Sequence, residues 1–125
     1  MTAAAPLRSA RPDPWVAGAE AVRLAVLTTP GVVALAESAA FQTHGPGAAV
    51  YGVALRSRGP GPVVLAVGVV IEAGVTLDPD CLGGVVRSVR TAAEAAWART
   101  GLRAAPGRVA PVEVAVHVVD VGWSV

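Results

Sequence analysis

The chain has 125 residues, which is enough for one domain with a single hydrophobic core. Its hydrophobic fraction is 54%, but it contains only three Trp, one Tyr and one Phe, so Val, Leu and Ala must fill most of that core. All ten basic residues are Arg, scattered from Arg8 to Arg108, and the net charge of +1 gives no electrostatic basis for binding nucleic acid or anionic lipid.

The start of the chain is predicted to be a disordered tail over residues 1–14, followed by a single α+β domain over residues 15–125. This tail holds three Pro, two Arg and Asp13, and it lacks the apolar stretch behind a basic start that a secretory signal has. The single cysteine, Cys81, excludes an internal disulfide and is compatible with a reducing compartment. No run of about 18 apolar residues exists. We therefore expect a cytoplasmic protein that does not itself span a membrane.

Two helices are predicted in the first part of the domain. Residues 16–27 place apolar side chains at helical spacing, and Pro30 and Gly31 follow them. Residues 32–40 are predicted as a short second helix, because their apolar side chains would share one face. A loop is expected over residues 42–47.

Two β-prone runs follow, at residues 49–56 and 63–72. The Gly/Pro-rich connector at residues 57–62 predicts that they form a hairpin. In the second run, the bulkier alternate side chains are assigned to the core: Val63, Leu65, Val67, Val69 and Ile71. The opposite face then carries Val64, Ala66, Gly68, Val70 and Glu72.

A long helix is predicted to begin after Asp78, because Asp is a favoured N-cap and the following Pro79 is tolerated in a first turn. An apolar stripe then runs along one face: Leu82, Val85, Val86, Val89, Ala93, Ala96 and Trp97. Gly101 is expected to be the C-cap. Residues 112–121 alternate strictly and predict a closing strand. Trp123, beyond this strand, could belong to the core, the tail or a partner contact.

The predicted fold is therefore α+β, with a three-stranded sheet, helices packed on one face, and the order α-β-β-α-β. Helices on one side leave the other sheet face uncovered, and a largely apolar exposed face is typical of a protein contact surface. The residues of this possible interaction surface are Arg56, Val64, Val70, Glu72, Glu113, Ala115, His117 and Val119. In the alternative arrangement, residues 32–47 fold over this face and close the monomer.

No catalytic, cofactor-binding or metal-binding residue is predicted. Cys81 would lie in the first turn of its helix, but no motif supplies a histidine partner, so a structural cysteine is the favoured interpretation. His117 and Asp120 could be considered as an acid/base pair or as metal ligands. They are three residues apart on a strand, so we expect their side chains on opposite faces, where they could not bind one ion. Glu72 and Glu113 could form a carboxylate pair across strands, but solvated carboxylates are the favoured interpretation.

Four segments together resemble the alkaline shock protein family of envelope stress response proteins. They are Pro30-Gly31-Val32, residues 67–74, Thr100-Gly101-Leu102 and the closing strand V-E-V-A-V-H-V-V-D-V at residues 112–121. The closing strand is the most specific of the four. The resemblance covers about residues 16–122, nearly the whole predicted domain.

The resemblance implies a small, non-enzymatic bacterial protein without a cofactor. Such a protein is cytosolic, associates with itself, and is held at the inner face of the cell membrane by a small membrane-anchored partner. Two other hypotheses come from different classes. A KH-like nucleic-acid-binding module is disfavoured because no two glycines have the G-x-x-G spacing and the chain has no Lys. A small enzyme using Cys81 is the third hypothesis.

Overall fold

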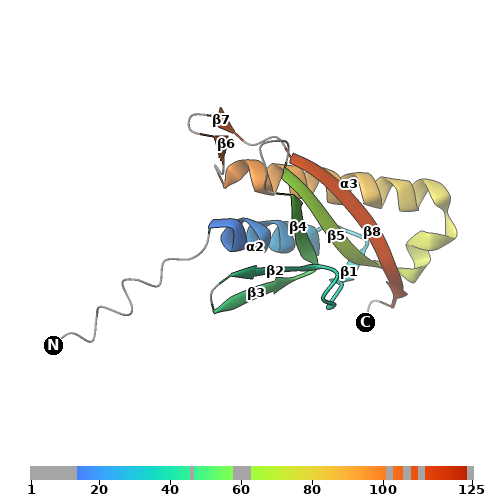
Figure 1. The fold of residues 1–125 in the computed structure, drawn as a ribbon. Coiled ribbons are helices and arrows are strands. Elements are labelled where there is room, and N and C mark those ends of the chain that lie inside the picture. Colours follow the sequence, from blue (N-terminus) through green and yellow to red (C-terminus); the bar gives the residue numbers. More distant parts are fainter. Residues whose placement is uncertain are drawn as a thin grey trace.

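The computed structural model describes residues 14–45, 47–57, 63–100, 103–105, 108–109 and 112–123. The elements follow in the order α2 (Pro14–Leu27), β1 (Val32–Leu35), β2 (Gln42–Gly45), β3 (Ala48–Tyr51), β4 (Val53–Ser57), β5 (Val63–Glu72), the 3-10 helix η1 (Ala73–Leu77), α3 (Pro79–Arg99), β6 (Arg103–Ala105), β7 (Arg108–Val109) and β8 (Val112–Gly122) (Figure 1). Most of the expected tail, residues 1–13, lies outside the described residues. Pro14 already belongs to α2, where its missing N–H is tolerated at the first turn.

The central sheet is mixed and is built around β5. β8 runs parallel to β5 from Val63 opposite Val112 to Glu72 opposite Gly122. Since β8 occupies one edge of β5, the antiparallel strands β4 and β1 share the other edge, β4 along its first half and β1 along its second. The prediction of an α+β fold is confirmed, but the predicted strand count and order are wrong. The sheet has four strands, and the described residues also form the two-stranded sheets β2–β3 and β6–β7.

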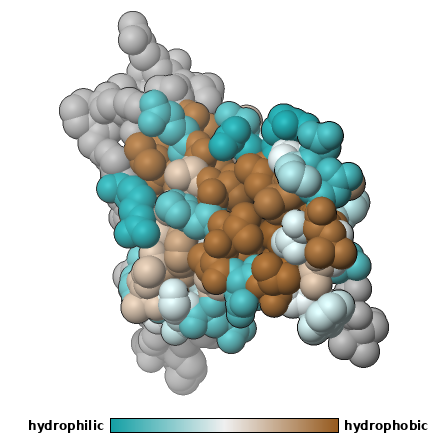
Figure 2. All heavy atoms as spheres, turned by 90° about the vertical axis from the view of Figure 1, so that its right-hand side faces the viewer, coloured by the Kyte–Doolittle hydropathy of each residue, from teal (hydrophilic) through white to brown (hydrophobic). Residues whose placement is uncertain are grey.

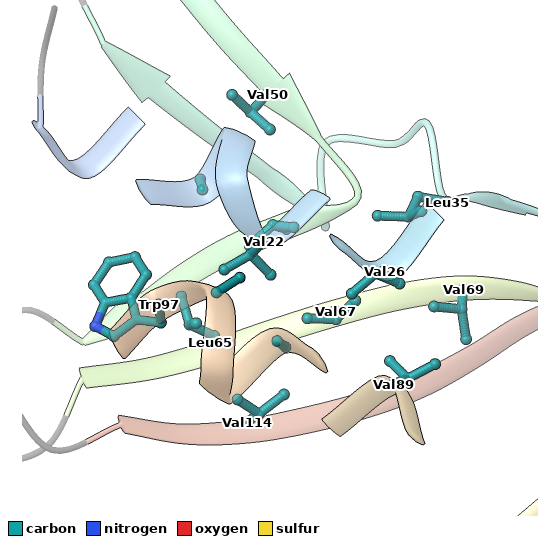
Figure 3. Packing of buried hydrophobic residues seen from close by; sticks show 14 of the residues in the cluster. Val22, Val26, Leu35, Val50, Leu65, Val67, Val69, Val89, Trp97 and Val114 are labelled. Atoms are coloured by element: carbon teal, nitrogen blue, oxygen red, sulfur yellow. The ribbon is translucent and has the colours of Figure 1, made fainter. Parts of the chain in front are cut away.

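The alternation along β5 predicts its core face correctly, but Ala66 and Gly68 on the opposite face are buried as well. The five assigned to the core are each at most 2% exposed: Val63, Leu65, Val67, Val69 and Ile71. Helices α2 and α3 both pack against this face of the sheet, and their buried residues join β5 and Val114 of β8 in one cluster (Figure 3). The expectation that the helices lie on one face of the sheet is therefore confirmed.

Helix α3 begins as its sequence predicts. The Asp78 side chain accepts a hydrogen bond from the Asp80 backbone N–H over 2.9 Å, which caps the helix. Four residues of the predicted stripe are buried: Val89, Ala93, Ala96 and Trp97. The Trp97 ring stacks on Trp15 of α2, with centroids 5.8 Å apart, so the aromatic pair joins the two helices. The expected C-cap, Gly101, lies outside the described residues.

The predicted second helix over residues 32–40 is wrong, because residues Val32–Leu35 form strand β1. Gly31 adopts φ 93°, a conformation that favours glycine, and its carbonyl accepts a hydrogen bond from the Glu72 N–H over 2.9 Å. The chain therefore turns directly onto the free edge of β5. Val32 and Val33 are β-branched and suit a strand once that edge is available.

The predicted strand over residues 49–56 is interrupted at Gly52, which has φ 95°. A Cβ atom at this glycine would lie 2.5 Å from the Leu35 Cβ, so a side chain cannot be accommodated. β3, before the break, pairs with β2, whereas β4, after it, pairs with β5 and confirms the predicted hairpin. The β2–β3 hairpin lies beside α2 (Figure 1), with Thr43 and Val50 buried.

Candidate functional site

The sheet face that points away from α2 and α3, here called the open face, carries the predicted interaction surface. On β5, Val64 and Val70 are half-buried and alternate with the core residues. On β8, Glu113 lies opposite Val64, and His117 lies opposite Gly68. The remaining predicted residues also lie on these strands and on β4: Glu72, Ala115, Val119 and Arg56.

The open face is not covered by residues 32–47. β1 extends the sheet rather than crossing it, and the β2–β3 hairpin contacts α2 on the opposite side. Only the loop between β1 and β2 reaches the open face, through Phe41 above Gly68. A Cβ atom at Gly68 would lie 2.9 Å from the Phe41 ring and from the Ala36 Cβ. Residues 32–47 therefore do not close the monomer over the open face, except where Phe41 lies above Gly68.

Phe41 is the centre of a cluster that the sequence analysis missed. Its ring lies 5.3 Å from the His117 imidazole and 5.9 Å from the Arg56 guanidinium carbon, measured from the ring centroid. The Arg56 guanidinium also donates a hydrogen bond to the Ala40 carbonyl over 2.8 Å. The cluster therefore links β4, the loop and β8 across the sheet. Phe41, the only phenylalanine in the chain, was a signal that could have drawn attention to this loop.

A β-bulge in β8 changes which residues share the open face. Val69 lies opposite Val118, but Val70 lies opposite Asp120, so Val119 is the extra residue. The bulge shifts the alternation by one position. His117 and Asp120 therefore lie on the same face, and the expectation that they point to opposite faces is wrong. The described residues nevertheless contain no group of three or more His, Cys, Asp or Glu that could hold a metal ion.

Beside the bulge, the open face is hollowed. The hollow has a volume of about 530 Å³ and is lined by Ala34, Leu35, Ala36, Glu37, Ser38, Val70, Val119 and Asp120. Its lining is mainly aliphatic, and Val119 is 42% exposed. Glu37 and Asp120 are both exposed and give the hollow two carboxylates, whereas none of the lining residues is a cation.

Hydrophobic side chains are also exposed at one end of the molecule. Figure 2 shows a continuous hydrophobic area on the side where η1, the start of α3 and the end of β8 lie. Exposed apolar residues on these elements include Leu77, Val118 and Val121, at 86%, 41% and 46%. Trp123, directly after β8, is 82% exposed, so it does not belong to the core.

Cys81 lies in a separate hollow of about 450 Å³, lined by Pro30, Gly31, Glu72, Val75, Cys81, Gly84, Val85 and Ser88. Its thiol donates a hydrogen bond to the Asp78 carboxylate over 3.6 Å. This hydrogen bond and the carboxylate charge raise the pKa of the Cys81 thiol, because both favour the protonated form. The local electrostatics therefore oppose the thiolate that a nucleophilic cysteine requires.

The carboxylate pair considered for Glu72 and Glu113 is not formed. Glu113 lies opposite Val64, whereas Glu72 lies opposite Gly122, so the two residues are near opposite ends of the ten-residue strand β5. They cannot act on one substrate bond as acid and base.

Comparison with known proteins gives no match to a family model, a curated protein or a solved structure. Across the described part of the chain, no helix is both long and apolar enough to cross a bilayer.

Proposed function

We propose that this chain is a non-enzymatic interaction protein similar to the alkaline shock protein family of envelope stress response proteins, and that its open face is the contact surface. The face would bind either another copy of the chain or a membrane-associated partner at the inner side of the cell membrane. The observation that supports this most is the aliphatic hollow on a sheet face that neither helix covers.

The composition of the open face suits a protein contact. Half-buried Val70 and exposed Val119 line the hollow, and half-buried Val33 lies with Val70 around Gly122. Covering these side chains would remove apolar surface from water, which contributes roughly 25 cal/mol per Å². Polar groups surround this apolar centre, as they do in protein interfaces.

The charges of the open face indicate the chemistry of a partner. Glu37 and Asp120 line the hollow, and Glu72 and Glu113 lie on the same face. Arg56 already donates to the Ala40 carbonyl. A partner surface that carries Arg or Lys beside aliphatic side chains would complement this face, whereas the phosphates of a nucleic acid would be repelled by it.

The proposal is tested with two charge substitutions at exposed apolar positions. Val119→Glu places a carboxylate in the hollow, whereas Leu24→Glu places one on α2, where Leu24 is 54% exposed on the helix side of the sheet. Both variants are first compared with the wild type by thermal denaturation. The solution mass is then measured over a concentration series by light scattering, and tagged protein is used for affinity capture from membrane fractions.

We expect Val119→Glu to remove concentration-dependent species or a captured membrane protein that the wild type and Leu24→Glu retain. If folded Val119→Glu matches the wild type in both measurements, the open face is not the contact surface. If capture instead recovers nucleic acid in a salt-dependent manner, the KH-like alternative is favoured.

A further inference from the structure

The outer edge of β8 is a second surface of the molecule that another strand could join. β8 is an eleven-residue strand that pairs with β5 along one edge. Among the described strands, none pairs with its other edge. A long unpaired edge presents backbone N–H and C=O groups that can accept another strand.

Only part of β8 is regular enough to pair continuously. From Val112 to Val118 the register with β5 is unbroken, and the bulge at Val119 follows. A bulge bends a strand and disrupts its ladder, so a strand added at the outer edge would pair with residues 112–118 and end at the bulge.

This regular segment is complementary to itself. In an antiparallel pair with a two-fold axis at Ala115, Val112 lies opposite Val118 and Val114 lies opposite Val116. Glu113 then lies opposite His117, and symmetry forms this pair twice. An imidazole N–H can donate a hydrogen bond to a carboxylate, and opposite residues in a sheet pack closely. Moving the axis to Val114 or Val116 would place Glu113 opposite Ala115 or Val119 and lose both polar pairs.

The exposure of the segment fits this pairing. Glu113, Ala115 and His117 are exposed on the open face, and Val118 is 41% exposed on the helix side. We propose that β8 pairs antiparallel with β8 of a second copy, centred on Ala115, so that two central sheets join into one. This inference rests on the self-association included in the proposed function, but it uses the sheet edge and leaves the hollow free for a partner.

One contact works against the pairing. Arg90 of α3 donates from Nε to the Val114 carbonyl over 3.4 Å, which is long for a hydrogen bond. Charged side chains at an edge are one way in which proteins limit strand addition. We therefore expect a reversible dimer rather than a permanent one.

Disulfide trapping tests the register directly. Ala115→Cys in a Cys81→Ser background places the two substituted side chains opposite one another at the symmetry axis. Val119→Cys in the same background is the matched control, since this exposed residue is on the same strand but beyond the regular segment. Under mild oxidation we expect a covalent dimer from Ala115→Cys and at least tenfold less from Val119→Cys.

A charge exchange tests the cross-strand pairs. His117→Glu alone places carboxylates opposite each other at two positions, which should weaken the dimer by roughly tenfold. Combining His117→Glu with Glu113→His again places an imidazole opposite a carboxylate and should recover the dimer, although the contact between residue 117 and Phe41 stays lost. Recovery in the double variant would therefore exclude a purely structural effect of losing that contact.

The outcomes separate this inference from the proposed function. The β8 pairing is overturned if Ala115→Cys and Val119→Cys give equal amounts of covalent dimer. It is also overturned if the variant with both His117→Glu and Glu113→His dimerises as weakly as His117→Glu alone. Either result holds even if the protein associates through the open face. Trapping that survives Val119→Glu in the Ala115→Cys background supports the β8 edge independently of the open face. A wild type that is monomeric at every concentration, with no trapped species, overturns self-association altogether.

Discussion

The Phe41 ring lies against the His117 imidazole, with ring centroids 5.3 Å apart and planes inclined by 59°. Phe41 belongs to the loop after β1, at one edge of β5, whereas His117 belongs to β8 at the other edge. The contact is possible because residue 68, between them, is a glycine. The loop, β5 and β8 are therefore coupled on the open face, beside the hollow.

Gly68→Ala tests this coupling. The added Cβ would lie 2.9 Å from both the Ala36 Cβ and the Phe41 ring, so one of these neighbours must move. We expect a loss of about 1–3 kcal/mol in the free energy of unfolding, which is typical of overpacking. Urea denaturation followed by tryptophan fluorescence measures it.

Gly74→Ala is the matched control for this substitution. The nearest atom to a Cβ at Gly74 is a Glu72 carboxylate oxygen, 3.8 Å away, which is an ordinary contact. Its unfolding midpoint should stay close to that of the wild type. Equal unfolding midpoints for Gly68→Ala and Gly74→Ala would mean that the loop carrying Phe41 moves aside without a loss of stability.

Thr43→Val tests how the β2–β3 hairpin is held. The Thr43 hydroxyl is buried and donates a hydrogen bond to the Val53 carbonyl over 2.7 Å. Valine has nearly the same shape but removes the donor, so the Val53 carbonyl loses a buried partner. We expect a loss of about 1–3 kcal/mol in the free energy of unfolding.

Thr28→Val serves as the control for Thr43→Val in the same urea titration. The Thr28 hydroxyl also donates to a carbonyl, that of Ala25 over 2.9 Å, but it is exposed and water can replace it. This variant should lose less than about 0.5 kcal/mol. A loss at Thr43 no greater than at Thr28 would contradict a structural role for the buried bond.

Asp78→Asn tests the electrostatics of Cys81. The hydrogen bond to Asp78 and then the charge of Asp78 raise the pKa of the thiol. Removing the negative charge should lower this pKa toward its ordinary value, so more thiolate is present at a given pH. The rate of iodoacetamide alkylation should therefore rise, and its pH profile should move to lower pH. Asn is also a good N-cap, so α3 should stay folded.

Asp80→Asn is the corresponding control, because Asp80 is not among the causes of the Cys81 shift. Its alkylation profile should stay near that of the wild type. A profile for Asp78→Asn that moves to higher pH would reverse the assigned role of Asp78.

Local patterns in the sequence were sufficient where one element determines its own faces. The alternation along β5 predicted its buried side, and Asp78 with Pro79 predicted the start of α3. Both signals act within a few residues, through side-chain parity and a single cap. They are therefore readable without knowing the neighbours of the element.

The errors arose where pairing partners decide the structure. Residues 32–40 carry spacing compatible with a helix, but the free edge of β5 draws Val32–Leu35 into a strand. The bulge at Val119 depends on the register between β5 and β8. It brings His117 and Asp120 onto one face, although residues three apart on a regular strand point to opposite faces. Neither partner nor register is encoded in the alternation of a single strand.

Periodicity and local hydrogen bonding are enough to specify the α+β class, the long capped helix and the core face of β5. Three other features become visible only in the folded molecule: β8 runs parallel to β5 as an edge strand, Phe41 lies above Gly68, and an aliphatic hollow with two carboxylates opens beside the bulge. These features require contacts between residues far apart in the chain, and the free energy of such contacts depends on the whole packed arrangement rather than on any local pattern.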